Sequence, residues 1–143
     1  VRTITVLDIA PEALDRGKSS LGDSSAQVKW AQADITSWAP PKHAFDLWHD
    51  RAVFHFLTES SDQTAYIRCL NAGLKVGGYA IIATFAPDGP DTCSSLPIVK
   101  YDPEELALLL GPALKLIRYE FDLHETPWGS SQSFQYSLFQ KVN

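Results

Sequence analysis

Three short segments with the pattern of β-strands, each followed by an aspartate, constrain most strongly what this chain can fold into. The segments are residues 3–7, 28–33 and 45–49, and the aspartates are Asp8, Asp34 and Asp50. Residues 3–7 are rich in β-branched residues, as in a strand that is buried on both faces, and the other two segments are predicted strands. An aspartate at a strand end can simply turn the chain or cap the next helix. Three in succession favour a binding edge, because ligands collect outside the carboxyl ends of parallel strands.

Helices are predicted between the strands. Pro11 suits the first position of a helix that Gly22 ends. Ser60 and Gln63 have the spacing of a capping box, which predicts the start of the longest helix. The glycine pair at 77–78 predicts its end.

The second half of the chain adds one more buried strand, one helix and a hairpin. Tyr79 to Phe85 is almost uniformly apolar, and Asp102 begins a helix that ends at Gly111. Apolar and polar residues alternate over 117–123 and again over 134–138, which predicts an antiparallel pair. The expected fold class is therefore α/β: a Rossmann-like, doubly wound and mainly parallel sheet with a C-terminal antiparallel hairpin.

Composition limits the domain count and the classes of partner. The chain of 143 residues is 45% hydrophobic, so residues 1–143 are predicted to form a single domain. A formal net charge of -5 argues against the broad basic surface that binds nucleic acid. No apolar run approaches the roughly 20 residues that cross a bilayer, so no membrane partner is expected.

Cysteine and histidine usage bears on compartment and metals. Cys69 and Cys93 are isolated, and form neither a disulfide framework nor a metal knuckle. This pattern predicts a reducing, cytoplasmic setting. The four histidines include no His-x-x-x-His pair, so no metal site is expected.

Several short motifs occur in a characteristic order. They are Val6-Leu7-Asp8-Ile9, Ala33-Asp34-Ile35, Phe45-Asp46-Leu47-Trp48-His49-Asp50, Leu74-Lys75-Val76-Gly77-Gly78, the run from Trp48 to Leu57, and the closing hairpin. In order and spacing they resemble a class I S-adenosylmethionine-dependent methyltransferase of the bacterial small-molecule type. The resemblance covers essentially the whole chain, and begins after the family's first strand.

The resemblance implies roles for particular residues. Asp8 would hold the ribose hydroxyls of S-adenosylmethionine, and Ile9 would lie against the adenine. Asp34 would accept a hydrogen bond from the adenine amino group, with Ile35 as a neighbouring contact. The residues that would face the methionine part and the acceptor are His49, Asp50 and Arg51.

Methyl transfer asks mainly that the acceptor be positioned in a desolvated pocket, with a base only where the acceptor must lose a proton. His49 and His55 are the candidate bases, although either could equally be a packed polar side chain. Arg51 could bind a carboxylate on the acceptor, or pair with a nearby aspartate. The residues that could rim the pocket from the hairpin are His124, Trp128 and Gln132.

The family's first strand and glycine-rich loop would precede Val1, so the resemblance predicts an N-terminally truncated, partial domain. Such a fragment is expected to bind S-adenosylmethionine weakly or not at all, and to self-associate, as a dimer, through the face left by the missing strand. Two alternatives stay open: a non-catalytic remnant that serves as a binding or self-assembling module, and a nicotinamide-dependent oxidoreductase. The second acid, Asp34, and the terminal hairpin argue against the oxidoreductase.

Overall fold

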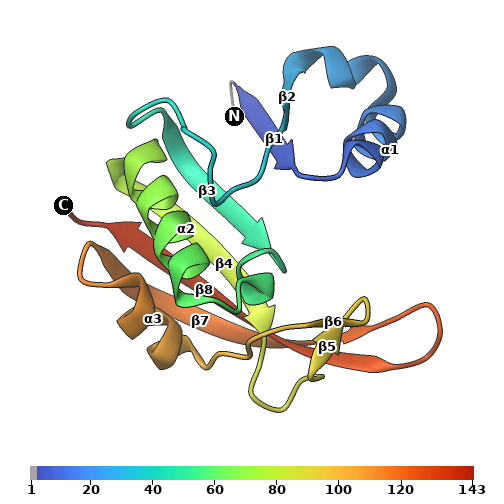
Figure 1. Ribbon diagram of the computed structural model, residues 1–143, viewed down its shortest axis with the longest axis vertical. Helices are drawn as coiled ribbons and strands as arrows, with labels where there is room; N and C mark the ends of the chain where they lie inside the picture. The colour runs from blue at the N-terminus through green and yellow to red at the C-terminus, as the bar shows by residue number, and fades with distance from the viewer. Residues whose placement is uncertain (1–2) are drawn as a thin grey trace. The chain divides into compact units, whose positions relative to one another are not determined.

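The computed structural model describes residues 3–143, and the chain forms two compact units, Val1–Ala39 and Pro40–Asn143 (Figure 1). The first unit contains β1 (Ile4–Asp8), α1 (Pro11–Leu21), a 3-10 turn η1 (Gly22–Gln27) and β2 (Val28–Gln32). Strands β1 and β2 pair in parallel, with Ile4 opposite Val28 and Asp8 opposite Gln32. The first unit is therefore one strand-helix-strand crossover whose two strands end at the same edge.

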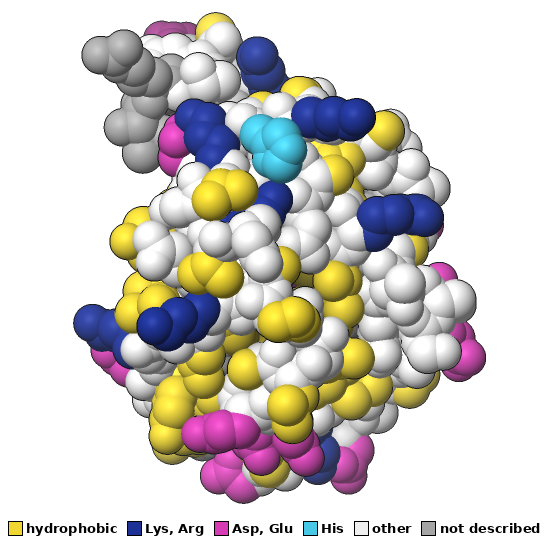
Figure 2. All heavy atoms as spheres, turned by 90° about the vertical axis from the view of Figure 1, so that its left-hand side faces the viewer, with side chains coloured by type: hydrophobic (Ala, Val, Ile, Leu, Met, Phe, Trp, Pro, Cys, Tyr) yellow, Lys and Arg dark blue, Asp and Glu magenta, His cyan; other side chains and the backbone are white. Residues whose placement is uncertain are grey.

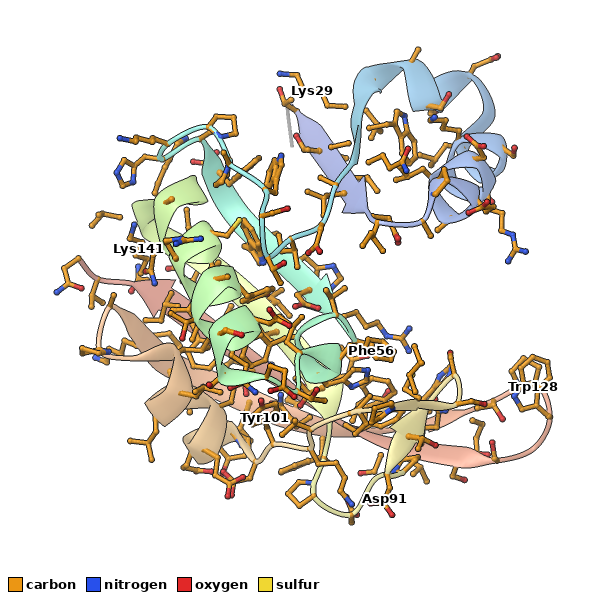
Figure 3. All side chains as sticks on the ribbon, in the orientation of Figure 1. Lys29, Phe56, Asp91, Tyr101, Trp128 and Lys141 are labelled. Atoms are coloured by element: carbon orange, nitrogen blue, oxygen red, sulfur yellow. The ribbon has the colours of Figure 1, made fainter. Side chains whose placement is uncertain are left out.

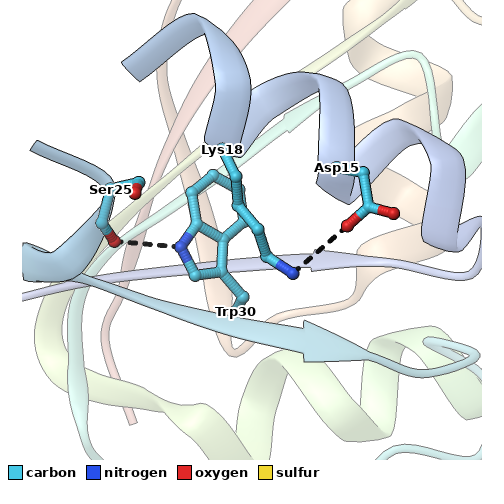
Figure 4. A network of polar contacts seen from close by, with 4 residues as sticks. All are labelled: Asp15, Lys18, Ser25 and Trp30. Carbon is cyan, nitrogen blue, oxygen red and sulfur yellow. Dashed lines mark hydrogen bonds and ion pairs between the residues drawn. The ribbon is translucent and has the colours of Figure 1, made fainter. Parts of the chain in front are cut away.

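The first unit is organised around the indole of Trp30 on β2 (Figure 4). The ring leaves no space for a side chain at Gly17, where an added Cβ would lie 3.0 Å from a Trp30 carbon. The indole Nε1 donates to the Ser25 carbonyl at 3.1 Å, and the Lys18 ammonium lies 5.9 Å from the ring centroid. Lys18 also pairs with Asp15 at 3.4 Å. These contacts fix α1 and η1 against the strands.

The second unit contains a four-stranded sheet in the order β3-β4-β8-β7 and a two-stranded ribbon of β5 and β6. Its elements are β3 (Phe45–Arg51), η2 (Phe54–Phe56), α2 (Ser60–Gly73), β4 (Leu74–Phe85), β5 (Thr92–Cys93), β6 (Leu96–Pro97), α3 (Pro103–Leu110), β7 (Leu114–Glu125) and β8 (Ser131–Lys141). β3 and β4 are parallel, whereas β8 is antiparallel to both β4 and β7. The α/β class and the C-terminal antiparallel hairpin are thus confirmed.

The core of the second unit lies between the sheet and helices α2 and α3, which Figure 1 shows in front of the sheet. Tyr66 and Leu70 of α2 and Leu106 of α3 are fully buried there. On the opposite face Leu47 is 52% exposed and Tyr79 is 42% exposed. Figure 2 shows hydrophobic side chains open to solvent among charged ones on one side of the molecule.

The predicted bounds of α2 are wrong at both ends. The residue that caps the helix is Glu59, without a side-chain hydrogen bond, and the helix ends at Gly73. Gln63 donates instead to the Leu57 carbonyl, at 2.8 Å. At the other end the Lys141 ammonium donates to the carbonyl oxygens of Asn71 at 2.5 Å and Leu74 at 3.0 Å (Figure 3). The helix therefore ends before the glycine pair, and a side chain distant in sequence supplies hydrogen bonds to carbonyl oxygens at that end.

The predicted start of α3 is confirmed. Asp102 accepts from the Glu105 backbone N–H at 2.8 Å, and the Glu105 carboxylate accepts from the Asp102 N–H at 3.3 Å. We expect Asp102→Ala to lower the free energy of unfolding by about 1 kcal/mol, the usual effect of losing an N-cap. Urea denaturation measures the change. Glu59→Ala is the matched control, because that N-cap side chain makes no cap bond; an equal loss in both variants would contradict the assignment.

Within residues 3–143, no helix has both the length and the apolar character that a bilayer-spanning helix requires.

Candidate functional site

The edge where β1 and β2 end brings together all four residues expected to contact the nucleoside. The Ala33 backbone N–H donates to the Asp8 carbonyl at 3.1 Å, which joins the two strand ends directly. Ile9 and Ile35 each follow one of the aspartates, and Ile9 is 64% exposed. Two carboxylates and an open apolar side chain therefore share one edge of the first unit.

Both carboxylates at this edge keep one oxygen available to a ligand. Oδ1 of Asp8 accepts from the Ala10 N–H at 2.8 Å. Oδ1 of Asp34 accepts from the Thr36 N–H at 2.8 Å and from its hydroxyl at 2.7 Å. These hydrogen bonds from Thr36 lower the pKa of Asp34. Within the described chain the Oδ2 atoms have no hydrogen-bond partner, so two acceptor atoms remain that suit ribose hydroxyls and an adenine amino group.

In the second unit, side chains alternate at the carboxyl end of β3. His49 and Arg51 are exposed, whereas Asp50 between them is buried. Successive residues of a strand point to opposite faces, so His49 and Arg51 share the face away from α2. The structure thus brings these two candidates together and separates Asp50 from them.

Asp50 closes the turn after β3. Its carboxylate accepts from the N–H groups of Val53 at 2.9 Å and Phe54 at 3.1 Å, and from the Tyr66 hydroxyl at 2.7 Å. The Tyr66 oxygen in turn accepts from Trp48 Nε1 at 3.1 Å. Burial raises the pKa of Asp50 despite these bonds. In this arrangement the carboxylate holds the backbone that follows Arg51.

Arg51 is paired with an aromatic side chain of β8. Its Nε donates to the Tyr136 hydroxyl at 3.1 Å, and its guanidinium carbon lies 5.0 Å from the Phe134 ring centroid. The alternative that Arg51 pairs with a nearby aspartate is wrong within the described residues, because no ion pair there includes it. No local pattern in the sequence indicates the contact with Tyr136, which joins residues 85 positions apart.

His55 lies in the core with no exposed surface. Its Nδ1 accepts from the Phe85 N–H at 3.4 Å, its Nε2 has no partner, and its ring contacts those of Phe56 and Phe85. Burial lowers the pKa of His55 to about 4. The side chain is therefore a neutral packing group in this structure, rather than one that an acceptor can reach.

The hairpin residues expected to rim a pocket lie at different positions along the hairpin. His124 pairs with Gln132 across β7 and β8. Trp128 stands at the tip of the hairpin and is 85% exposed (Figure 3). It is therefore an open side chain here, and not a packed anchor of the turn.

Comparisons with known proteins agree on one family. A family model described as a methyltransferase domain matches residues 1–78. No curated protein matches the sequence. Among solved structures, a SAM-dependent methyltransferase from Methanosarcina mazei has a TM-score of 0.78 at 14% identity, covering 98% of this chain and 82% of its own.

Two further similar structures are those of enzymes whose names state the reaction. The N-methyltransferase NodS of Bradyrhizobium japonicum, in complex with S-adenosylhomocysteine, has a TM-score of 0.72 at 20% identity, and covers 97% of this chain and 66% of its own. The 1,6-didemethyltoxoflavin-N1-methyltransferase of Burkholderia thailandensis, with bound 1,6-didemethyltoxoflavin and S-adenosylhomocysteine, has a TM-score of 0.71 at 18% identity. It covers 97% of this chain and 61% of its own.

The solved structures confirm the Rossmann-like α/β methyltransferase fold. The family model covers more than half of the chain, including β1, β2, β3 and the aspartates at their ends. The chain belongs to the S-adenosylmethionine-dependent methyltransferase family.

Proposed function

We propose that this protein transfers a methyl group from S-adenosylmethionine to a small-molecule acceptor. The observation that carries the proposal is the pair of carboxylates, Asp8 and Asp34, at the ends of two neighbouring parallel strands. Each has one oxygen that accepts no hydrogen bond from residues 3–143. S-adenosylmethionine supplies a methyl group already activated by its sulfonium. The protein's task is then to bind and orient.

Each proposed contact uses a group of suitable chemistry. Asp8 accepts from the ribose hydroxyls and Ile9 packs on the adenine, while Asp34 accepts from the adenine amino group beside Ile35. In the second unit, His49 and Arg51 face the acceptor. Asp50 and His55 are buried, so we assign them no contact with the acceptor. Their proposed role is to hold the backbone and the core next to His49 and Arg51.

A small acceptor fits the charge of the protein better than a polynucleotide. With 12 Lys and Arg against 17 Asp and Glu, the chain lacks the excess of positive charge with which proteins bind a phosphate backbone. The names of the two N-methyltransferases described above support this choice. We also propose a cytoplasmic setting, because the two isolated cysteines are typical of a reducing compartment.

Titration with S-adenosylhomocysteine tests the proposal. NMR chemical-shift titration is the suitable method, because it identifies the amides that respond and detects weak as well as tight binding. We expect shifts at the amides of Ile9 and Ile35, and a loss of about 1 to 3 kcal/mol in binding free energy for Asp8→Ala, the effect of losing a charge-assisted hydrogen bond. Asp23→Ala, in η1, is the matched control.

The same titration discriminates the alternatives. Equal affinities of the wild type and Asp8→Ala would remove Asp8 from the site. Binding of NAD in preference to S-adenosylhomocysteine would favour the oxidoreductase. Binding of neither ligand at millimolar concentration would favour a non-catalytic module.

We also propose that the protein self-associates through strand edges. In the described sheets β1 pairs only with β2, and β3 pairs only with β4, so each has one edge without a partner strand. Unpaired edges invite pairing with another chain. Light scattering over a range of concentrations tests this, and a monomer at every concentration would refute it.

A further inference from the structure

A row of three residues crosses the second unit's sheet on the face away from α2. Arg51 on β3 lies opposite Ala83 on β4, and Ala83 lies opposite Tyr136 on β8. Because the middle residue has only a methyl group, the Arg51 side chain can cross β4 and donate to the Tyr136 hydroxyl at 3.1 Å. The row therefore positions the guanidinium over the sheet.

An aromatic pair supports the guanidinium from beside this row. Phe134 is buried, with its ring centroid 5.0 Å from the Arg51 guanidinium carbon and 4.8 Å from that of Phe85. An arginine over a phenyl ring gains a favourable cation–π interaction. The Arg51 side chain thus samples fewer orientations than an ordinary surface arginine. It therefore loses less conformational entropy when a ligand binds.

The backbone after Arg51 is held equally firmly. Ala52 has a φ of 64°, a left-handed conformation that non-glycine residues rarely adopt. Its N–H donates to the Ala83 carbonyl at 2.9 Å, and Asp50 accepts from the next two N–H groups. Strained residues of this kind persist where surrounding bonds over-determine them, and they gather at functional sites.

Among the described residues, the terminal N–H groups of the Arg51 guanidinium have no hydrogen-bond partner. Its Nε donates to the Tyr136 hydroxyl, and among residues 3–143 Arg51 forms no hydrogen bond or ion pair with a carboxylate. The acid opposite Tyr136 on β7, Glu120, is paired with Arg118. Asp50 is turned to the other face and has three donors of its own. An exposed positive charge thus lacks a counter-charge.

We propose that Arg51 binds a carboxylate of the methyl acceptor through its two terminal nitrogens, with Tyr136, Phe134 and Ala83 as positioning residues. The two Nη groups form a planar fork that matches the two oxygens of a carboxylate. This inference rests on the proposed function for the identity of the ligand as acceptor. It deepens that function by naming an acidic acceptor.

Benzoate, a simple aromatic carboxylate, is the probe, with neutral benzamide and inorganic phosphate as comparisons. NMR titration of the 143-residue chain follows the Arg51 Nε–Hε and the Tyr136 amide. We expect benzoate to shift both signals and benzamide to shift neither. Arg51→Gln should abolish saturable binding, and Tyr136→Phe should weaken it about fivefold, the effect of one lost hydrogen bond. Arg68→Gln, which removes an exposed arginine of α2 and leaves the Arg118–Glu120 pair intact, should leave it unchanged.

Opposite outcomes overturn the inference. Benzoate binding that survives Arg51→Gln, or no shift at Arg51 at 100 mM (about the weakest binding such a titration detects), would show that Arg51 is not a carboxylate site. Tighter binding of phosphate than of benzoate would show that the chemical class is wrong. Because the titration contains no S-adenosylhomocysteine, its failure is independent of failure at Asp8.

Discussion

Asp50→Ala should lower the free energy of unfolding of the Pro40–Asn143 unit by about 3 to 5 kcal/mol, the range for breaking a buried charged network. The substitution leaves three donors without an acceptor: the N–H groups of Val53 and Phe54, and the Tyr66 hydroxyl. Each of these groups would stay buried or half-buried without its bond. Urea denaturation followed by circular dichroism measures the loss.

Two comparison variants make this result specific. Asp50→Asn should cost less than Asp50→Ala, because burial already raises the pKa of Asp50 and so favours a neutral group there. Asp46→Ala, which removes an exposed carboxylate of the same strand, should have a much smaller effect. If all three variants unfold at the same urea concentration, Asp50 has no special role in the turn.

The second large effect is a loss of stability in acid that depends on His55. Its folded-state pKa is about 4, below the ordinary value of 6.5. Between these values the unfolded chain binds a proton that the folded chain does not. The free energy of unfolding should therefore fall as the pH drops from 6.5 towards 4, by up to about 3 kcal/mol. Above pH 6.5 His55 adds no pH dependence.

Denaturation at several pH values with His55→Asn checks this expectation. The variant should be less stable at neutral pH, yet should lose less stability than the wild type between pH 6.5 and 4. His49→Asn, at an exposed histidine, should keep the full acid dependence. Asp50 has the opposite sign, since its raised pKa favours the folded state at low pH and that contribution is lost as the pH rises. Parallel pH profiles for the wild type and His55→Asn would refute the role of His55.

Local patterns predicted those elements whose signals lie close together in sequence. Asp102, Pro103 and Glu105 define the start of α3 within four residues, and all their capping bonds are local. Apolar and polar residues likewise alternate along β7 and β8, so the pattern that predicts these strands lies within each strand. Asp8 and Asp34 were placed correctly at one edge, because parallel strands joined by a helix must end on the same side.

Other features depend on residues that are distant in sequence. α2 ends at Gly73, before the glycine pair at 77–78, and there Lys141 donates to the carbonyl oxygens of Asn71 and Leu74. The burial of His55 depends on Phe85, thirty positions away. The Arg51 contact to Tyr136 depends on the order of strands in the sheet and on the small size of Ala83. Such contacts are set by topology, which local periodicity does not encode.

The order of strands also has a consequence for how the chain is made. β8 is synthesised after β3, β4 and β7, yet it lies between β4 and β7 and pairs with both. Until Phe134 to Gln140 have been synthesised, Tyr79 to Phe85 have no partner on that side. β7 cannot join the sheet at all without β8. The second unit therefore cannot complete its sheet before β8 has emerged, and a nascent chain that stalls before β8 exposes an apolar strand edge to chaperones and proteases.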